Sequence, residues 1–301
     1  MDTQPEKFQV VDVLQESERF LVQSVAYDGI TAVLKRAKTP EMTLNLQQEL
    51  EAYQVYGLMT EDKDCPFSTA SVLESHTDWM LISFLEGRPM RELMDGQNDK
   101  IYYDKLASIM AFCDNKVGIS FNDVRMSIPK QALDGQQVRI AEMIGRHSLL
   151  DAFGLEFLKP NLKQASDFYV VNSPQLKTCF VNADLTPAHV MVNGESLAIF
   201  DFENAEMLAP RFADVINVAT KIWFIEGDGD KALDFVDTFW NLSGQSGEAH
   251  ALQIKTLIYR RCIGFTDELL TDPNQHHNTS FTMTPEFAHN ISAVLEWANE
   301  L

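Results

Sequence analysis

Short apolar runs separated by polar residues predict strands in the first part of the chain. Such runs occur at residues 8–14, 19–26 and 30–35, and the third alternates before it ends in Lys35. Residues 46–59 then carry apolar positions at helical spacing. The N-terminal part should therefore contain an antiparallel sheet followed by a helix.

The later part of the chain is mainly helical in pattern. The segment 118–137 is typical of a loop, and we interpret it as a surface connection rather than as part of an acceptor pocket. At 301 residues the chain is long enough for a two-lobed body with a good core. Apolar residues at helical spacing predict helices at residues 103–115, 136–153, 162–171, 211–224, 230–242, 248–270 and 285–299.

An apolar hairpin interrupts this helical part. Residues 190–192 and 197–200 are strand-like, and an Asn-Gly dipeptide between them is a strong hairpin signal. If the turn has two residues, His189 lies opposite Ala198, whereas a four-residue turn places it opposite Phe200. In both registers the end of the first strand meets the end of the second.

Three polar residues that could carry chemistry flank this hairpin. Asp184 and His189 precede the first strand and Asp201 follows the second, so the fold should gather them at one spot. One carboxylate could hold a divalent ion and another could orient a hydroxyl nucleophile, which is the layout of phosphoryl transfer. The alternative is an exposed hairpin end with scattered polar residues.

The same residues resemble a known family. Asn-Ala-Asp-Leu at residues 182–185, His189, and Phe-Asp-Phe-Glu at residues 200–203 are similar to the catalytic and metal loops of the aminoglycoside phosphotransferase family, with its choline kinase-like relatives. The chain is identified as a divergent member. The resemblance implies an α+β protein-kinase-like fold, with an antiparallel N-lobe at residues 1–86 and a mainly helical C-lobe at residues 87–301.

The resemblance also assigns roles to the residues of these loops. It implies that Asp184 is the catalytic base and that Asp201 binds Mg²⁺. His189 would assist at the metal or the phosphate, as a catalytic and metal residue. Asn182 would be a scaffold residue, and Asp214, in a segment similar to the family's second acidic motif, would brace the catalytic loop.

Upstream residues match the nucleotide-binding part of the family. Lys35 matches the strand lysine that contacts the nucleotide phosphates, and either Glu49 or Glu51 could pair with it. The family register favours Glu51. The run at residues 78–90 resembles the family hinge, which implies that backbone groups around Phe84 and Leu85 receive the nucleotide base.

Some positions depart from the family pattern. The turn that should cover the phosphates, residues 15–18, has no glycine and contains two acids, which would repel phosphate. Asn182 replaces the usual histidine, and His189 replaces the usual metal-binding asparagine. These changes keep a catalytically weak or inactive nucleotide-binding pseudokinase, acting as a binding or regulatory module, open beside an active enzyme.

The expected reaction is transfer of the γ-phosphoryl group of ATP or GTP, with Mg²⁺, to a hydroxyl of a small molecule. The acceptor could be aminoglycoside-like or another compound, including a cationic one. The sequence decides neither the acceptor, nor ATP against GTP, nor the oligomeric state.

Charge and cysteine usage limit the other functional classes. A net charge of −20 disfavours nucleic acid and anionic membranes as partners, although it could also serve solubility alone. The four cysteines are scattered without metal-type spacing and are typical of reduced thiols. The paired histidines at residues 272–278 favour an exposed polar loop over a metal site. With no signal-like N-terminus and no long apolar stretch, we expect a cytoplasmic protein.

Overall fold

A computed structural model gives the fold of residues 8–116, 150–151, 154–271 and 285–301. These residues form two compact units. The first unit contains residues 8–116 and 182–206, and the second contains the described residues among 150–181 and 207–301. The division into lobes at residues 1–86 and 87–301, inferred from the family resemblance, stays a prediction.

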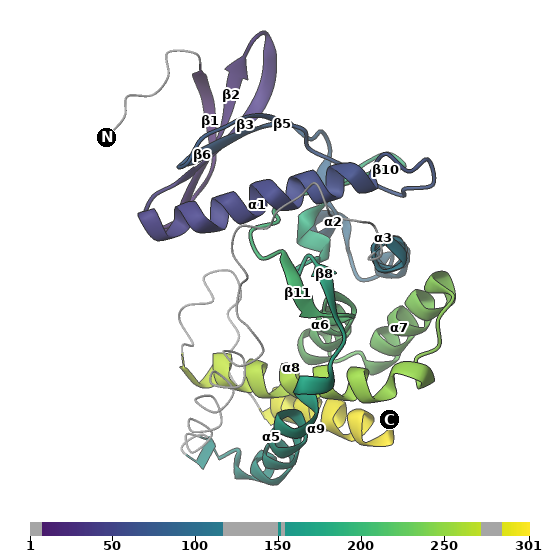
Figure 1. The fold of residues 1–301 in the computed structure, drawn as a ribbon. Helices are drawn as coiled ribbons and strands as arrows, with labels where there is room; N and C mark the ends of the chain where they lie inside the picture. Colours follow the sequence, from purple (N-terminus) through teal and green to yellow (C-terminus); the bar gives the residue numbers. More distant parts are fainter. Residues whose placement is uncertain (1–7, 117–149, 152–153, 272–284) are drawn as a thin grey trace. The chain divides into compact units, whose positions relative to one another are not determined.

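The first unit is built on a five-stranded antiparallel sheet with the strand order β1-β2-β3-β6-β5 (Figure 1). The predicted N-terminal strands are all present, and their ends lie within two residues of the predicted ones. Because β3 pairs with both β2 and β6, Lys35 lies near the middle of the sheet. The strands are β1 (Gln9–Glu16), β2 (Phe20–Tyr27), β3 (Ile30–Ala37), β5 (Val72–Ser75) and β6 (Trp79–Ser83).

The two faces of this sheet differ in chemistry. Ala32 and Leu34 of β3 are buried on one face, in a cluster with Trp79 and Leu81 of β6. Side chains alternate along a strand, so Lys35 points to the opposite face. That face looks toward the helix α1 (Figure 1).

Helix α1 (Pro40–Met59) begins earlier than the predicted start at residue 46. The side chain of Thr39 caps it by accepting a hydrogen bond from the Met42 N–H at 3.4 Å, and proline occupies the first helical position. Periodicity identified only the part of the helix with buried apolar residues, which begins at Leu46, whereas Met42 and Leu44 in the first turns are not buried. The helix packs on β3 and β6 through a face that includes buried polar side chains.

The predicted hairpin is present in the same unit. The His189 carbonyl accepts a hydrogen bond from the Phe200 N–H at 3.1 Å, so His189 lies opposite Phe200, as in the second of the two predicted registers. The hairpin belongs to a four-stranded sheet made of β4 (Ser68–Thr69), β10 (Ser196–Ile199), β9 (Val190–Asn193) and β7 (Arg88–Pro89).

Gly87 is required where the hinge meets this hairpin. Its φ is +117°, and a Cβ atom there would lie 2.4 Å from the carbonyl oxygen of Val192. Only glycine allows this backbone approach. The chain then continues into α2 (Met90–Leu93) and α3 (Asp99–Lys116), the latter close to the predicted helix at residues 103–115.

The second unit is mainly helical. Strands β8 and β11 pair in a two-stranded sheet beside the helices. The segment 118–137 and the loop at residues 272–278 lie outside the described residues. The predicted helix at residues 136–153 also lies outside them, except for residues 150–151. The described elements are α5 (Lys159–Asn172), β8 (Thr178–Val181), β11 (Glu206–Pro210), α6 (Ala213–Lys221), α7 (Gly229–Ser243), α8 (Ala251–Thr271) and α9 (Pro285–Glu300).

The predicted α+β class is confirmed, with an antiparallel sheet in the N-terminal region and mostly helices in the C-terminal region. Within the described part of the chain, the helices are either too short or too polar to cross a membrane.

Candidate active site

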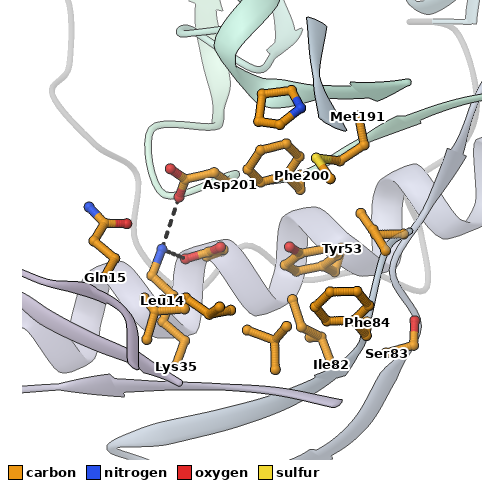
Figure 2. Close-up of a pocket in the computed structure, with 15 residues that line it drawn as sticks. Leu14, Gln15, Lys35, Tyr53, Ile82, Ser83, Phe84, Met191, Phe200 and Asp201 are labelled. Carbon is orange, nitrogen blue, oxygen red and sulfur yellow. Dashed lines mark hydrogen bonds and ion pairs between the residues drawn. The ribbon is translucent and has the colours of Figure 1, made fainter. Parts of the chain in front are cut away.

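A cavity of about 380 Å³ opens in the first unit, beside the lysine-bearing face of the sheet (Figure 2). Apolar side chains line most of it, and Lys35, Glu49 and Asp201 place charge at one end. Such a cavity, apolar with a few convergent polar groups, is typical of a small-molecule site. Its lining residues are Leu14, Gln15, Val22, Val33, Lys35, Glu49, Tyr53, Ile82, Ser83, Phe84, Leu85, Pro89, Met191, Phe200 and Asp201.

Lys35 is the centre of the charged end. Its Nζ lies 2.7 Å from Oε2 of Glu49, 2.9 Å from Oδ1 of Asp201 and 3.7 Å from Oε2 of Glu203. Burial alone would lower the pKa of Lys35, but these carboxylates outweigh burial and raise the pKa above its ordinary value. The ammonium group is therefore held charged and in place at the cavity (Figure 2).

The partner of Lys35 is Glu49, which corrects the preference for Glu51. Two residues along a helix turn the side chain by about 200°, so Glu49 and Glu51 point to nearly opposite sides of α1. Glu49 shares its side with Tyr53, one turn later, and both line the cavity. Glu51 is also buried but on the other side of the helix. The family register alone could not resolve a shift of two residues.

Asp184, His189 and Asp201 are brought together, as the hairpin pattern predicted. Nδ1 of His189 lies 2.6 Å from the backbone carbonyl oxygen of Asp184 and 4.0 Å from its Oδ2. A carbonyl can only accept, so Nδ1 carries the proton. Nε2 then faces Asp201, whose Oδ2 lies 3.8 Å away. The structure gives the positions of these three residues, and their catalytic roles stay predictions.

Two of these loops hold non-glycine residues in the left-handed region. Ala183 has a φ of +67° and Asp201 has a φ of +62°. Such conformations are costly for residues with a Cβ and are concentrated at functional sites. Asn182, which is buried, supports the first loop, because its side-chain oxygen accepts a hydrogen bond from the Asp184 N–H at 3.2 Å.

The site fits a magnesium ion shared with a nucleotide. Burial would raise the pKa of Asp201, but Lys35 and His189 outweigh it and lower the pKa, which keeps the carboxylate ionised. No group of three or more potential ligands in the described ranges is arranged to hold a metal by itself. Mg²⁺ in phosphoryl-transfer sites usually takes only one or two protein carboxylates and completes its shell with phosphates and water. Asp201, with His189 as a softer neighbour, meets that requirement.

The remaining predicted residues have different positions. Phe84 and Leu85 both line the cavity. Phe84 lies at the end opposite to the charged residues (Figure 2). Asp214 lies in the first turn of α6, in the second unit. Its bracing role therefore stays a prediction.

The sequence patterns did not reveal the side chains that hold the loop at residues 201–205. The ring of Phe202 stacks on that of Tyr56, with the ring centroids 4.4 Å apart. It meets the ring of Tyr53 edge-on, with the centroids 4.6 Å apart. The amide of Gln48 donates a hydrogen bond to the backbone carbonyl of Ala205. Tyr53 and Tyr56 follow Glu49 at helical spacing, and that signal could have found them once Glu49 was placed, whereas Gln48 gives no such signal.

Glu49 should give the protein a specific pH dependence. Burial raises the pKa of Glu49 to about 7 in the folded state, against an ordinary value of 4.5. Between these values the folded protein keeps a proton that the unfolded chain has released. The free energy of unfolding should therefore fall as the pH rises through this window, by on the order of 3 kcal/mol from this group.

Urea unfolding of the parent and of Glu49→Gln at pH 4.5, 6 and 7.5 tests this expectation. The parent should lose more stability over the range than the variant, because the amide does not titrate. An identical pH profile for both proteins would contradict the assignment.

The family model described as the phosphotransferase enzyme family matches residues 8–244. The curated proteins contain no match to the chain. Solved structures with a similar fold include the following three. The GDP and kanamycin complex of APH(2")-IIIa has a TM-score of 0.60 and 16% identity, covering 97% of this chain and 94% of that chain.

The streptomycin–ATP ternary complex of APH(2")-IIa has a TM-score of 0.54 and 12% identity, covering 97% of this chain and 92% of that chain. The apo form of a thermostable mutant of aminoglycoside phosphotransferase APH(4)-Ia has a TM-score of 0.56 and 14% identity, covering 97% of this chain and 96% of that chain. These likenesses confirm the predicted protein-kinase-like fold. The family match spans most of the chain, and the protein therefore belongs to the phosphotransferase enzyme family.

Proposed function

We propose that the protein is a small-molecule kinase that moves the γ-phosphoryl group of ATP or GTP to a hydroxyl. The observation that carries the proposal is the position of Lys35, held by Glu49 and Asp201 at the charged end of an otherwise apolar cavity. A purine base fits the apolar end, and a polyphosphate fits the end that holds a fixed cation.

In this proposal the cavity binds the nucleotide from both ends. Backbone groups near Phe84 and Leu85 receive the base, and Lys35 contacts the phosphates. Asp201 and His189 would hold a magnesium ion, which supplies positive charge to the phosphate oxygens when it is bound. The family members in solved structures include complexes with GDP, ADP and ATP, which supports a nucleotide as co-substrate.

Asp184 is proposed to orient the acceptor hydroxyl and to take its proton. The hydroxyl oxygen forms a new bond to the γ-phosphorus, the bond to the bridging oxygen breaks, and the nucleoside diphosphate leaves. His189 supports this step by fixing the backbone of Asp184 through its Nδ1–H. Little covalent chemistry is required of the protein, so positioning and charge supply most of the rate.

The acceptor is proposed to be a small molecule, and its class is left to experiment. Solved relatives bind kanamycin, streptomycin or gentamicin. The net charge of −20 would favour a cationic acceptor of that kind. We also propose a cytoplasmic location, because nucleoside triphosphates are available there and the four cysteines, all within the described residues, form no disulfide.

An inactive nucleotide-binding protein is the second candidate. One observation favours it: the ring of Phe20 covers Lys35, with Nζ 4.7 Å from the ring centroid, beside a turn without glycine. Such a protein would bind nucleotide without transferring phosphate.

The thermal shift with nucleotide tests the proposed site. We expect ATP or GTP with Mg²⁺ to stabilise the parent by about 2.7 kcal/mol at a hundredfold excess over the dissociation constant. The shift should be smaller without Mg²⁺ and should disappear in Asp201→Ala. Glu195→Ala, which alters an exposed carboxylate in the hairpin turn, is the matched control and should keep the shift.

A parent protein that no nucleotide stabilises would refute the kinase and the pseudokinase alike. A shift without phosphate transfer to any acceptor or to water would favour the pseudokinase.

A further inference from the structure

The turn between β1 and β2 cannot bind phosphate as a glycine-rich turn does. In such turns the backbone N–H groups approach the phosphate closely. Here Oγ of Ser17 accepts hydrogen bonds from the N–H groups of Arg19, at 3.2 Å, and Phe20, at 3.0 Å. The Ser17 N–H donates to the Phe20 carbonyl at 2.9 Å. The N–H groups of Ser17, Arg19 and Phe20 are thus engaged within the turn itself.

The side chain of Arg19 extends from this turn toward the metal loop. Its Nη1 lies 3.2 Å from Oε1 of Glu203, and the other carboxylate oxygen of Glu203 lies 3.7 Å from Nζ of Lys35. Arg19 also contributes to the lowered pKa of Asp201, which places its charge within electrostatic reach of that carboxylate. Glu203 therefore links the two cations on one side of the charged cavity end.

Charge balance at this end favours a second protein cation in addition to Lys35 and the proposed magnesium ion. Glu49, Asp201 and Glu203 all surround Lys35, so its single charge is already shared among three carboxylates. A triphosphate adds further negative charge at the same place. The side chain of Arg19 is 48% exposed while its guanidinium is held at one edge by Glu203, so the planar fork can still meet a phosphate with two parallel hydrogen bonds.

We propose that Arg19 is a nucleotide-phosphate-binding residue that takes the place of the backbone donors of a glycine-rich turn, and that Glu203 is the positioning residue that holds it. The inference rests on the proposed function, because it requires a nucleotide in the cavity. Arg19 would bind the terminal phosphates, since the turn lies at the charged end and not at the apolar end of the cavity.

The test compares ligands that differ only in phosphate number. Isothermal titration with Mg²⁺ measures ATP, ADP and adenosine, and the guanine series in parallel, on the parent, Arg19→Gln and Arg19→Lys. We expect Arg19→Gln to weaken triphosphate binding by about 10- to 100-fold, as for loss of charge-assisted hydrogen bonds. Nucleoside affinity should stay unchanged. Arg19→Lys, which keeps the charge without the fork, should be intermediate.

Lys100→Gln is the matched control. Lys100 is also a cation in an exposed ion pair, with its Nζ 3.4 Å from Oδ1 of Asp104, and it lies in the same unit. Its loss removes the same charge at a residue of α3 that is not among those lining the cavity. It should leave the affinity for every ligand within about twofold, as expected for an exposed pair.

Each other result overturns a distinct claim. If the parent binds neither nucleotides nor nucleosides, the proposed function fails and the inference fails with it. If the parent binds triphosphate but Arg19→Gln binds it equally well or more tightly, the inference alone is wrong. A uniform loss for nucleosides and triphosphates would show a structural role and would equally reject it. Should Arg19→Gln fail to fold, Arg19→Lys carries the comparison, and parent-like triphosphate affinity there would reject the fork contact.

Discussion

Asp184→Asn should lower the rate of phosphoryl transfer by about 10²- to 10⁴-fold, the usual contribution of a positioned general base. The amide keeps the size of the side chain but cannot take the proton of the acceptor hydroxyl. The N–H of residue 184 should still donate to Asn182, so the local loop is expected to persist. Nucleotide affinity should therefore change by no more than about twofold.

Transfer of labelled γ-phosphate is the measurement, first to a panel of small hydroxyl compounds that includes aminoglycosides, and to water where no acceptor reacts. Glu195→Gln makes the same chemical change at a fully exposed position of the hairpin turn and should transfer at the parent rate. An Asp184→Asn enzyme that also transfers at the parent rate would remove Asp184 from the role of base.

Lys35→Met should reduce the free energy of unfolding by on the order of 3–5 kcal/mol and abolish nucleotide binding. The exposed fraction of the Glu49 side chain is only 1%, so without the ammonium group its carboxylate is left uncompensated away from water. The loss of the ammonium group destabilises the carboxylates of Asp201 and Glu203 less, because these side chains are more exposed to water. Chemical unfolding and nucleotide titration measure the two effects separately.

The double variant Lys35→Met/Glu49→Leu separates stability from function. Replacing a buried ion pair by apolar side chains of similar volume is often neutral or stabilising, so the double variant should recover most of the lost stability. It should still fail to bind nucleotide, since the cation is absent. Lys100→Met, at an exposed pair with Asp104, should change stability by less than about 1 kcal/mol. If Lys35→Met is as stable as this control, Lys35 is not the partner that holds Glu49.

The pattern of the sequence predicted the elements well where the signal is local. Short apolar runs identified β1 and β2, alternation identified β3, helical spacing identified the helices of the second unit, and the Asn-Gly dipeptide identified the hairpin. It also predicted that Asp184, His189 and Asp201 would meet, because the register of a hairpin fixes which residues lie opposite one another. The first turns of α1 bury no apolar side chain, so the apolar pattern did not identify the start of the helix.

The sequence by itself determined the first three strands, the hairpin, most of the helices, the positions of the charged residues along them and the family to which the chain belongs. Only the tertiary structure decided that Lys35 pairs with Glu49 and that Arg19 reaches Glu203. Both contacts join residues from separate elements, and their geometry depends on how a helix is rotated against a sheet and how a turn folds over a loop. Local periodicity shows which helix positions share a face, and only packing decides which face meets the sheet.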